Sequence, residues 1–387
     1  MSASRLYLDW NATAPLSEAA RAAFVEALDL SGNPSSVHAE GRQARAALEK
    51  ARRQVAALAG REPAHVWFTS GATEAANLVL TPDFRMGRSA LRIGALYVSA
   101  IEHPAVREGG RFPAGAVFEL PVLPSGVIDI DALRQRLSTH DAESGMPMVA
   151  VMLVNNETGI VQPVAAVAEV VRAAGGLLVV DAVQAAGRLD LSQHASEADF
   201  LILSSHKIGG PKGVGAMIAR GETLMPAPLL RGGGQEKGHR SGTENLAAII
   251  GFGAAAEEAL VDLEARNASI GVLRDRLEAG MMDAAPDVIL HGKNGPRVSN
   301  TTFFSLPGLK SETGQIAFDL EGIALSAGSA CSSGRVGESH VLAAMGFDPK
   351  LGGLRISIGP GTTAADIDRA LAAFSKIAGR RRLAGAA

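Results

Sequence analysis

Two apolar stretches of this sequence end in side chains that could take part in covalent chemistry. Leu177–Val180 is followed directly by Asp181, and Phe200–Leu203 is followed by Ser204 and then by Lys207. A lysine amine can form a Schiff base with a carbonyl group, and a carboxylate can keep a pyridine nitrogen protonated. Taken alone, Asp181 is more often a helix N-cap or turn residue and Lys207 an exposed loop residue. Together they are typical of a pyridoxal phosphate site, which needs both groups.

The run Thr69-Ser70-Gly71-Ala72-Thr73-Glu74 follows a predicted strand and opens a predicted helix. Small residues at the start of a helix leave backbone N–H groups pointing at whatever lies beyond it, and the helix dipole favours an anion there. The pattern therefore indicates a phosphate site. An ordinary helix start is an equally good interpretation of this run by itself.

The chain has a single cysteine, Cys331, within the run Ser326–Gly334, which is rich in Gly, Ala and Ser. One cysteine excludes an intramolecular disulfide and a structural zinc site built from thiolates. Most lone cysteines are buried and inert, but such a run is typical of a loop and favours an accessible thiol. The nine histidines show no metal-ligand spacing with carboxylates, so we expect no catalytic metal.

The composition is that of an average globular protein. Of 387 residues, 47% are hydrophobic and 20% are charged, and 37 Lys and Arg oppose 40 Asp and Glu for a net charge of −3. This balance argues against general binding to nucleic acid or to an anionic membrane. No apolar run reaches the roughly 18 residues of a membrane span, and the first residues hold no apolar signal segment. We therefore expect a cytoplasmic enzyme.

The elements that must position these residues alternate along the chain. Strands are predicted at 65–69, 95–99, 148–154, 177–180 and 200–203, and helices after Ser17, at 40–60 and at 163–174. Fully apolar strands that alternate with helices indicate a mainly parallel sheet covered by helices. Ligands of such proteins bind at the carboxyl edge of the sheet, where Asp181 is expected.

A long helix from Glu244 to Gly271 is expected to lead out of this sheet. Mixed strands and helices follow it, with a terminal helix at 364–377. The predicted fold class is therefore α/β, a large domain with a mainly parallel sheet plus a smaller α+β domain. The predicted division is 16–258 for the large domain, and 1–15 with 259–387 for the small domain that carries the cysteine run.

Taken in order, these motifs resemble those of the cysteine desulfurases, fold type I pyridoxal phosphate enzymes of the class V aminotransferase family. The resemblance extends over nearly the whole chain. Besides the runs described above, the matching segments are Leu6–Asp9 with Ala12-Thr13, Gly32–Ser36, Glu102-His103, Val154–Gly159, Gly232–Glu236, Arg240–Thr243 and Arg355. So many ordered motifs make a chance match implausible.

The resemblance implies a role for each matching residue. Lys207 would form the Schiff base and shuttle protons, Asp181 would pair with the ring nitrogen, and His103 would stack on the ring and take part in proton transfer. Further cofactor contacts are implied for Ala72, Thr73, Asn156, Gln184, Ser204 and His206, and for Thr243 acting from a second subunit. A homodimer with shared sites is therefore implied. Arg355, with Asn156, would bind the substrate and its α-carboxylate.

The resemblance also implies a reaction. L-Cysteine would become L-alanine while its sulfur passes to Cys331 as a persulfide. An iron–sulfur scaffold or another acceptor protein would then take the sulfur, and nitrogenase maturation and tRNA thiolation remain open alongside housekeeping cluster assembly. Contact of the persulfide with an iron–sulfur cluster would be transient, so no resident metal is implied.

Two other readings remain open. A selenocysteine lyase or related pyridoxal phosphate lyase or aminotransferase has the same fold, and Cys331 in its loop argues against an aminotransferase. A lyase would not strictly need Cys331, so a Cys331→Ala variant separates it from a desulfurase. A non-catalytic scaffold of the same fold is the second alternative, and the joint presence of Lys207, Asp181 and His103 argues against it.

Overall fold

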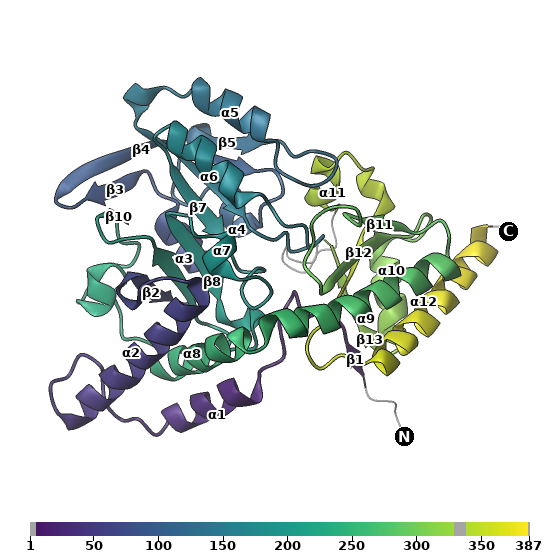
Figure 1. Cartoon of the computed structure of the whole chain (residues 1–387), viewed down its shortest axis with the longest axis horizontal. Helices are drawn as coiled ribbons and strands as arrows, with labels where there is room; N and C mark the ends of the chain where they lie inside the picture. The colour runs from purple at the N-terminus through teal and green to yellow at the C-terminus, as the bar shows by residue number, and fades with distance from the viewer. Residues whose placement is uncertain (1–4, 329–337, 386–387) are drawn as a thin grey trace.

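The structure is a computed structural model that describes residues 5–328 and 338–385. Figure 1 shows a large sheet flanked by helices and a smaller sheet beside it, with helix α9 (Leu263–Ala284) running from one part to the other. The N-terminal strand β1 (Leu6–Tyr7) pairs in parallel with β13 (Ile323–Ala324) of the smaller part. The chain therefore starts in the small part, enters the large one and returns.

The large sheet has the strand order β10-β3-β4-β6-β7-β8-β9-β2, with β5 beside β4. Its central strands pair in parallel: β4 (Ser89–Ser99), β5 (Val117–Leu120), β6 (Met146–Met152), β7 (Leu177–Asp181) and β8 (Phe200–Ser204). The edges pair antiparallel: β10 (Leu224–Pro226) and β3 (Asp83–Met86) on one side, β9 (Gly215–Ala219) and β2 (Val66–Thr69) on the other. The predicted α/β class is confirmed, with antiparallel edges added to the parallel centre.

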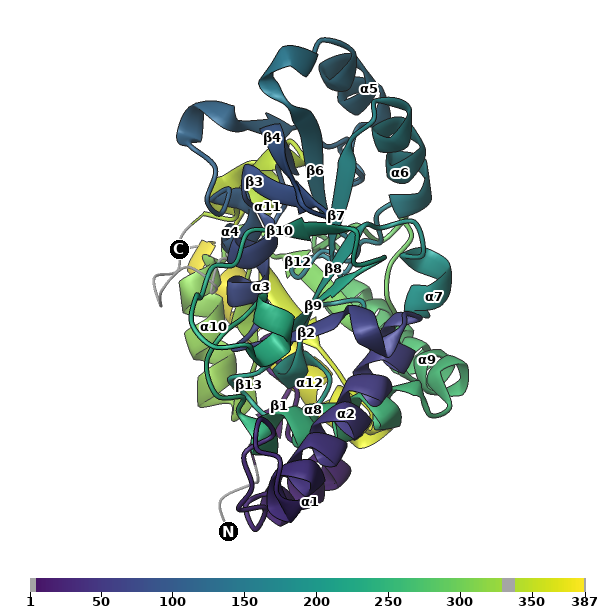
Figure 2. The same ribbon diagram turned by 90° about the vertical axis from the view of Figure 1, so that its left-hand side faces the viewer.

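Helices bury both faces of this sheet, and Figure 2 shows the sheet between the two groups. On β6, Val149 and Val151 face one cluster of buried side chains, while Met148 and Ala150 face the other. This alternation is the period of a strand covered on both sides. The first face packs on α2 (Ala39–Ala59), α5 (Ile130–Ser138), α6 (Val164–Ala173), α7 (Leu191–His194) and α8 (Leu246–Leu260), and the second on α3 (Ala72–Val79) and α4 (Pro104–Arg107).

The predicted ends of the first two helices are confirmed. Helix α1 (Glu18–Ala27) is capped by Ser17, whose hydroxyl oxygen accepts a hydrogen bond from the Ala20 N–H. Helix α2 ends at Gly60, whose φ of 61° is the left-handed conformation that glycine adopts at least cost.

The expectation of one helix from Glu244 to Gly271 is wrong, because α8 ends at Leu260 and α9 begins at Leu263. Asp262 between them has a φ of +48°, which no helix interior allows. The Arg266 guanidinium donates to the carbonyl oxygens of Ala259 at 2.5 Å and Val261 at 2.8 Å. These bonds satisfy the open end of α8, so a side chain from the next helix stabilises the break.

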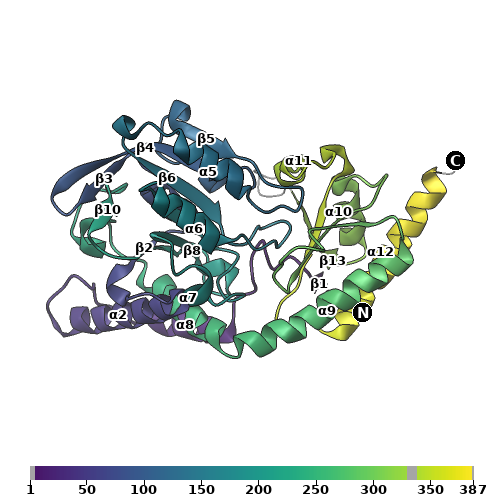
Figure 3. The same cartoon turned by 45° about the horizontal axis from the view of Figure 1, so that its top comes forward.

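The small sheet has the antiparallel order β11-β12-β15-β14. Its strands are β11 (Ile289–His291), β12 (Thr301–Ser305), β15 (Leu354–Ser357) and β14 (Ser326–Ala327), and its helices are α10 (Ser311–Leu320), α11 (His340–Ala344) and α12 (Ala364–Gly385). Helices α9 and α12 lie side by side (Figure 3). Leu6 and Leu8 belong to the same buried cluster as these elements. The predicted domain boundaries stay a prediction.

Across the described ranges, no helix combines the length and the apolar character that crossing a membrane would require.

Candidate active site

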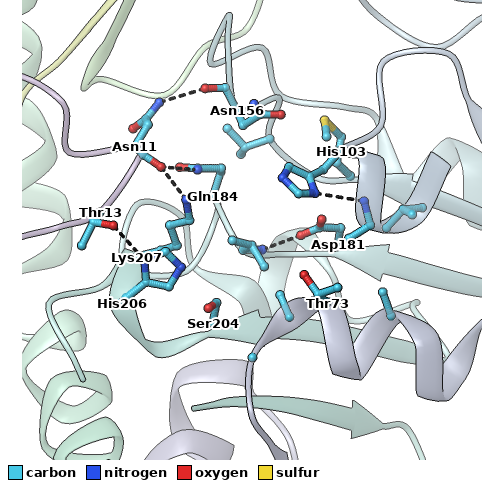
Figure 4. A pocket seen from close by; sticks show the side chains of 18 of the residues that line it. Asn11, Thr13, Thr73, His103, Asn156, Asp181, Gln184, Ser204, His206 and Lys207 are labelled. Atoms are coloured by element: carbon cyan, nitrogen blue, oxygen red, sulfur yellow. Dashed lines mark hydrogen bonds between the residues drawn. The ribbon is translucent and has the colours of Figure 1, made fainter. Parts of the chain in front are cut away.

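A cavity of about 440 Å³ lies at the carboxyl edge of the parallel strands, where the sequence places the candidate residues. Of the residues predicted for the site, those that line it are Ala72, Thr73, His103, Asn156, Asp181, Gln184, Ser204, His206, Lys207 and Arg355. Figure 4 shows how most of them converge on one space. The last residues of β7 and β8, the segments that follow β4, β6, β7 and β8, and the start of α3 supply all of these except Arg355, which comes from β15 of the small sheet.

Lys207 ends the short helical turn Ser205–Lys207 that follows β8. Its Nζ donates to the carbonyl oxygens of Asn11, at 2.7 Å, and Ala12, at 2.9 Å. Two carbonyl groups from the N-terminal segment therefore hold the amine at the wall of the cavity.

Asp181 is the last residue of β7 and is half-buried. Its Oδ1 accepts a hydrogen bond from the Val183 N–H at 2.9 Å. Burial raises the pKa of this carboxyl to about 6, against the lowering effects of that hydrogen bond and of the Lys207 charge. A protonated ring nitrogen beside Asp181 would favour its ionised form, so the carboxyl suits a cationic ligand atom.

His103 caps α4, and its Nδ1 accepts a hydrogen bond from the Ala105 N–H at 3.1 Å. A ring nitrogen that accepts cannot carry the proton, so the neutral ring is protonated on Nε2. Burial lowers the pKa of His103 to about 4, and the positive charges of Lys207 and His340 add to this. The imidazole is therefore neutral near pH 7.

The start of α3 forms the opposite end of the site. Its N-cap is Gly71, which offers no side-chain hydrogen bond, and a Cβ at this position would meet no atom within 4 Å. Within the described ranges no side chain caps the N–H groups of the first turn, which lies beside the cavity together with the hydroxyls of Thr73 and Ser204. An uncapped helix start of this kind suits a phosphate group.

His206 also lines the cavity, with its Nδ1 3.1 Å from the Thr13 hydroxyl. Burial lowers the pKa of His206 to about 4, with smaller contributions from the charges of Lys207 and Lys212. The ring is therefore a neutral hydrogen-bonding group. An open helix start, the half-buried carboxyl of Asp181 and a lysine amine around one cavity together fit pyridoxal phosphate.

Arg355 lines the cavity although only 1% of it is exposed. Its Nη2 donates to Asp9 Oδ1 at 2.8 Å, and its Nη1 donates to the carbonyl oxygen of Asn156 at 2.7 Å. The buried Nε has no hydrogen-bond partner among the residues that the structure describes. A guanidinium with an unsatisfied donor can take a further acceptor such as a carboxylate.

The sequence reasoning missed Asn11. Its carbonyl oxygen accepts from Gln184 Nε2 at 2.9 Å as well as from Lys207, and its Nδ2 donates to Thr301 Oγ1 at 3.0 Å. Asn11 therefore joins the large part, the small part and the candidate lysine. Its position between the matching segments Leu6–Asp9 and Ala12-Thr13 is the signal that could have identified it.

One predicted residue does not line this cavity, and another cannot be placed relative to it. Thr243 is exposed and does not line it within this single chain, so its predicted role from a second subunit stays a prediction. Cys331 lies outside the described residues. The roles assigned to the other residues also stay predictions, since proximity alone does not test them.

Comparison with known proteins identifies the family. The family model described as "Aminotransferase class-V" matches residues 6–370. An IscS-like cysteine desulfurase from Mycobacterium tuberculosis is 36% identical over 389 residues, which cover 98% of this chain and 98% of that protein. A NifS-like protein from Rickettsia africae superposes with a TM-score of 0.84 at 29% identity, over 96% of this chain and 99% of that one. SspA in complex with cysteine superposes with a TM-score of 0.74 at 26% identity, over 92% of this chain and 100% of that one. The chain therefore belongs to the class-V aminotransferase family and, within it, to the cysteine desulfurases.

Proposed function

We propose that this protein uses pyridoxal phosphate to convert L-cysteine to L-alanine and receives the sulfur on Cys331 as a persulfide. The observation that carries the proposal is the single cavity that collects Lys207, Asp181 and His103 beside the open start of α3. Kinship to cysteine desulfurases, and the likeness to SspA, which binds cysteine, support the choice of substrate.

Pyridoxal phosphate, when bound, supplies an aldehyde for the amino group of the substrate and a cationic ring that accepts electrons from its Cα. The N–H groups of the first turn of α3, with Thr73, Ser204 and His206, would hold the phosphate. Asp181 would keep the ring nitrogen protonated, and Lys207 would bind the aldehyde in the resting protein.

The remaining side chains act on the substrate. Arg355 would bind the α-carboxylate at the wall of the cavity through a charge-assisted hydrogen bond that fixes the orientation of Cα. Lys207 Nζ would take the proton from Cα, because its amine lines the same cavity. Neutral His103 would hold or return a proton through Nε2.

The sulfur step breaks the Cβ–S bond of the substrate and forms an S–S bond. The Cys331 thiolate attacks the substrate sulfur, since the thiolate is the reactive form of a thiol. The electron pair of the broken bond stays on Cβ, which takes a proton. L-Cysteine and one protein thiol thus give L-alanine and one persulfide, with no outside oxidant or reductant.

Sulfur delivery and assembly form the finer part of the proposal. We propose a homodimer in which Thr243 of each chain completes the phosphate site of its partner, in keeping with its exposure. The proposed acceptor is an iron–sulfur scaffold protein, supported by kinship to the IscS-like relative. A cytoplasmic location stays a prediction of the sequence.

The test uses the holoenzyme with L-cysteine and no reductant. The parent should form about one L-alanine per subunit and a persulfide on Cys331, and a Cys331→Ala variant should form neither. Equal alanine formation in the variant would exclude Cys331 as the nucleophile and favour a lyase. A Lys207→Ala variant should lose the yellow colour of the bound cofactor; a variant that kept colour and activity would contradict the role given to Lys207.

A further inference from the structure

The two described ends of the cysteine run meet at one buried oxygen atom. Gly328 follows β14, and Ser339 is the N-cap of α11. The Ser339 hydroxyl donates to Glu157 Oε2 at 2.6 Å. A Cβ on Gly328 would lie 2.7 Å from the same oxygen, so the Gly328 backbone packs directly against this carboxyl group. Glu157 therefore contacts the chain on both sides of residues 329–337.

Glu157 is itself held rigidly. It is 2% exposed and lies in the turn after β6, where its N–H donates to Asn155 Oδ1 at 3.0 Å. Asn155 Oδ1 also accepts from the Thr158 N–H at 2.9 Å, and its Nδ2 donates to the Ile101 carbonyl at 3.1 Å. This turn also carries Asn156, which lines the cavity, so Glu157 links the ends of the cysteine run to the wall of the site.

A second contact fixes the start of α11. His340 Nε2 lies 3.0 Å from the carbonyl oxygen of Glu102, the residue before His103. A carbonyl can only accept, so Nε2 carries the proton. The Ser339 hydroxyl oxygen also accepts from the Leu342 N–H at 3.1 Å, as an N-cap does. The start of α11 is thus attached to two of the turns that line the cavity.

The electrostatic surroundings of Glu157 strengthen this contact. Burial raises the pKa of its carboxyl to about 7, while the hydrogen bond from Ser339 and the charge of Arg355 act in the opposite direction. Without Ser339, the buried carboxylate would lose a hydrogen bond that helps offset its desolvation. The contact is therefore costly to break.

We propose that Glu157 is a positioning residue for sulfur transfer, which holds both ends of the cysteine run and so sets how often Cys331 reaches the substrate sulfur. This inference rests on the proposed function. Cys331 is three residues from Gly328 in the sequence, so we expect a shift of these ends to displace the thiol relative to the cavity. Misplacement of a reacting group by about 1 Å can lower a rate on the order of 100-fold.

The test compares Ser339→Ala, the conservative Ser339→Thr and the isosteric Glu157→Gln in the holoenzyme. Ser17→Ala is the matched control, because Ser17 also caps a helix and makes no hydrogen bond with Glu157. Ser339→Ala should slow persulfide formation on Cys331 roughly 10- to 100-fold. Substrate binding should be unchanged, so the absorption of the cofactor should respond to the same concentrations of L-cysteine as in the parent. Ser339→Thr should restore most of the rate. Ser339→Ala combined with Glu157→Gln should be no slower than Ser339→Ala alone, since the Ser339–Glu157 hydrogen bond is already absent from Ser339→Ala.

Alkylation of the single cysteine gives a readout that needs no turnover. Iodoacetamide should react with Cys331 about threefold faster or more in Ser339→Ala, and at the parental rate in Ser17→Ala. Unchanged persulfide formation and alkylation in Ser339→Ala would overturn the proposal, and so would an equal effect of Ser17→Ala. If Cys331→Ala still formed alanine, the proposed function would fail, whereas the alkylation rates would still decide whether Glu157 holds the run.

Discussion

Replacing Asp181 by asparagine should stabilise the cofactor-free protein at pH 8 and weaken its binding of pyridoxal phosphate. The reason is the position of this carboxyl, which burial in the cavity wall makes expensive to ionise when no cation faces it. Asparagine has nearly the same shape, keeps an Oδ1 that can accept from the Val183 N–H, and never ionises.

The size of the effect follows from the pKa. Burial raises the pKa of Asp181 from 3.8 to about 6. Each pKa unit corresponds to about 1.4 kcal/mol, so ionisation of the Asp181 carboxyl in the folded, cofactor-free protein at pH 8 costs roughly 3 kcal/mol of stability. The folded state binds this proton more tightly than the unfolded chain does. The stability that this tighter proton binding at Asp181 contributes is therefore fully present below about pH 4 and is lost as the pH rises through about 6. At pH 5 the cost is about half of its value at pH 8.

The assay is urea unfolding of the cofactor-free parent and the Asp181→Asn variant at pH 8 and pH 5, followed by tryptophan fluorescence. Comparing the two proteins at each pH cancels the titration of all other groups. The variant should be more stable by up to roughly 3 kcal/mol at pH 8 and by about half as much at pH 5. In a separate titration, it should bind pyridoxal phosphate at least about tenfold more weakly, because it cannot pair with a protonated ring nitrogen.

General damage to the fold would lower both the stability and the cofactor affinity of the variant, whereas we expect the stability to rise and the affinity to fall. A variant that is no more stable than the parent at pH 8 would show that burial does not penalise the Asp181 carboxylate. A stability gain that is the same at both pH values would refute the titration argument. Unchanged cofactor affinity would remove Asp181 from the ring-nitrogen role.

Further predictions concern packing, buried charge and substrate binding. Gly359→Ala should lower the free energy of unfolding by about 1–3 kcal/mol, because its Cβ would lie 2.2 Å from the Trp10 ring. The control is Gly361→Ala, whose Cβ would meet no atom within 4 Å and which should leave the free energy of unfolding unchanged. Thermal unfolding of the two variants measures the difference. Glu236→Ala should lower the free energy of unfolding by about 3–5 kcal/mol, because it leaves buried Arg52 without the carboxylate that it binds at 2.8 and 2.9 Å. Denaturant unfolding measures this loss, and a loss below about 1 kcal/mol would contradict the prediction. Arg355→Lys should raise the KM for L-cysteine roughly 10- to 100-fold with a smaller change in kcat, as steady-state alanine formation can measure; an unchanged KM would exclude a carboxylate-binding role.

The centre of the fold was predictable because its strands are short, fully buried and therefore continuously apolar. The short strand β3 was not, since of the two apolar residues among its four only Phe84 is buried, and Met86 is exposed. The break between α8 and α9 was also invisible, because no Gly or Pro marks it. It depends on Arg266, a side chain of the following helix, which no local pattern connects to the carbonyl groups it binds.

The cofactor half of the site was predictable for a related reason. Asp181, Lys207 and Thr73 each follow an apolar strand within a few residues, so the strand pattern itself places them at one edge. Asn11 has no such marker. It contacts Lys207 across 196 residues of sequence, and tertiary packing alone brings the two together.

The N-terminal segment joins the two halves of the candidate site. Asp9 binds the Arg355 guanidinium, and two residues later the Asn11 carbonyl binds Lys207, while Leu6 and Leu8 anchor the segment in the core of the small part. The group proposed to bind the substrate carboxylate and the amine proposed to take its α-proton are thus attached to neighbouring residues of one extended chain. Their separation is fixed by a segment three residues long, which moves little once its leucines are buried. The predicted boundary at residue 15 therefore does not separate a binding part from a catalytic part: the segment before it completes the site that the large sheet begins.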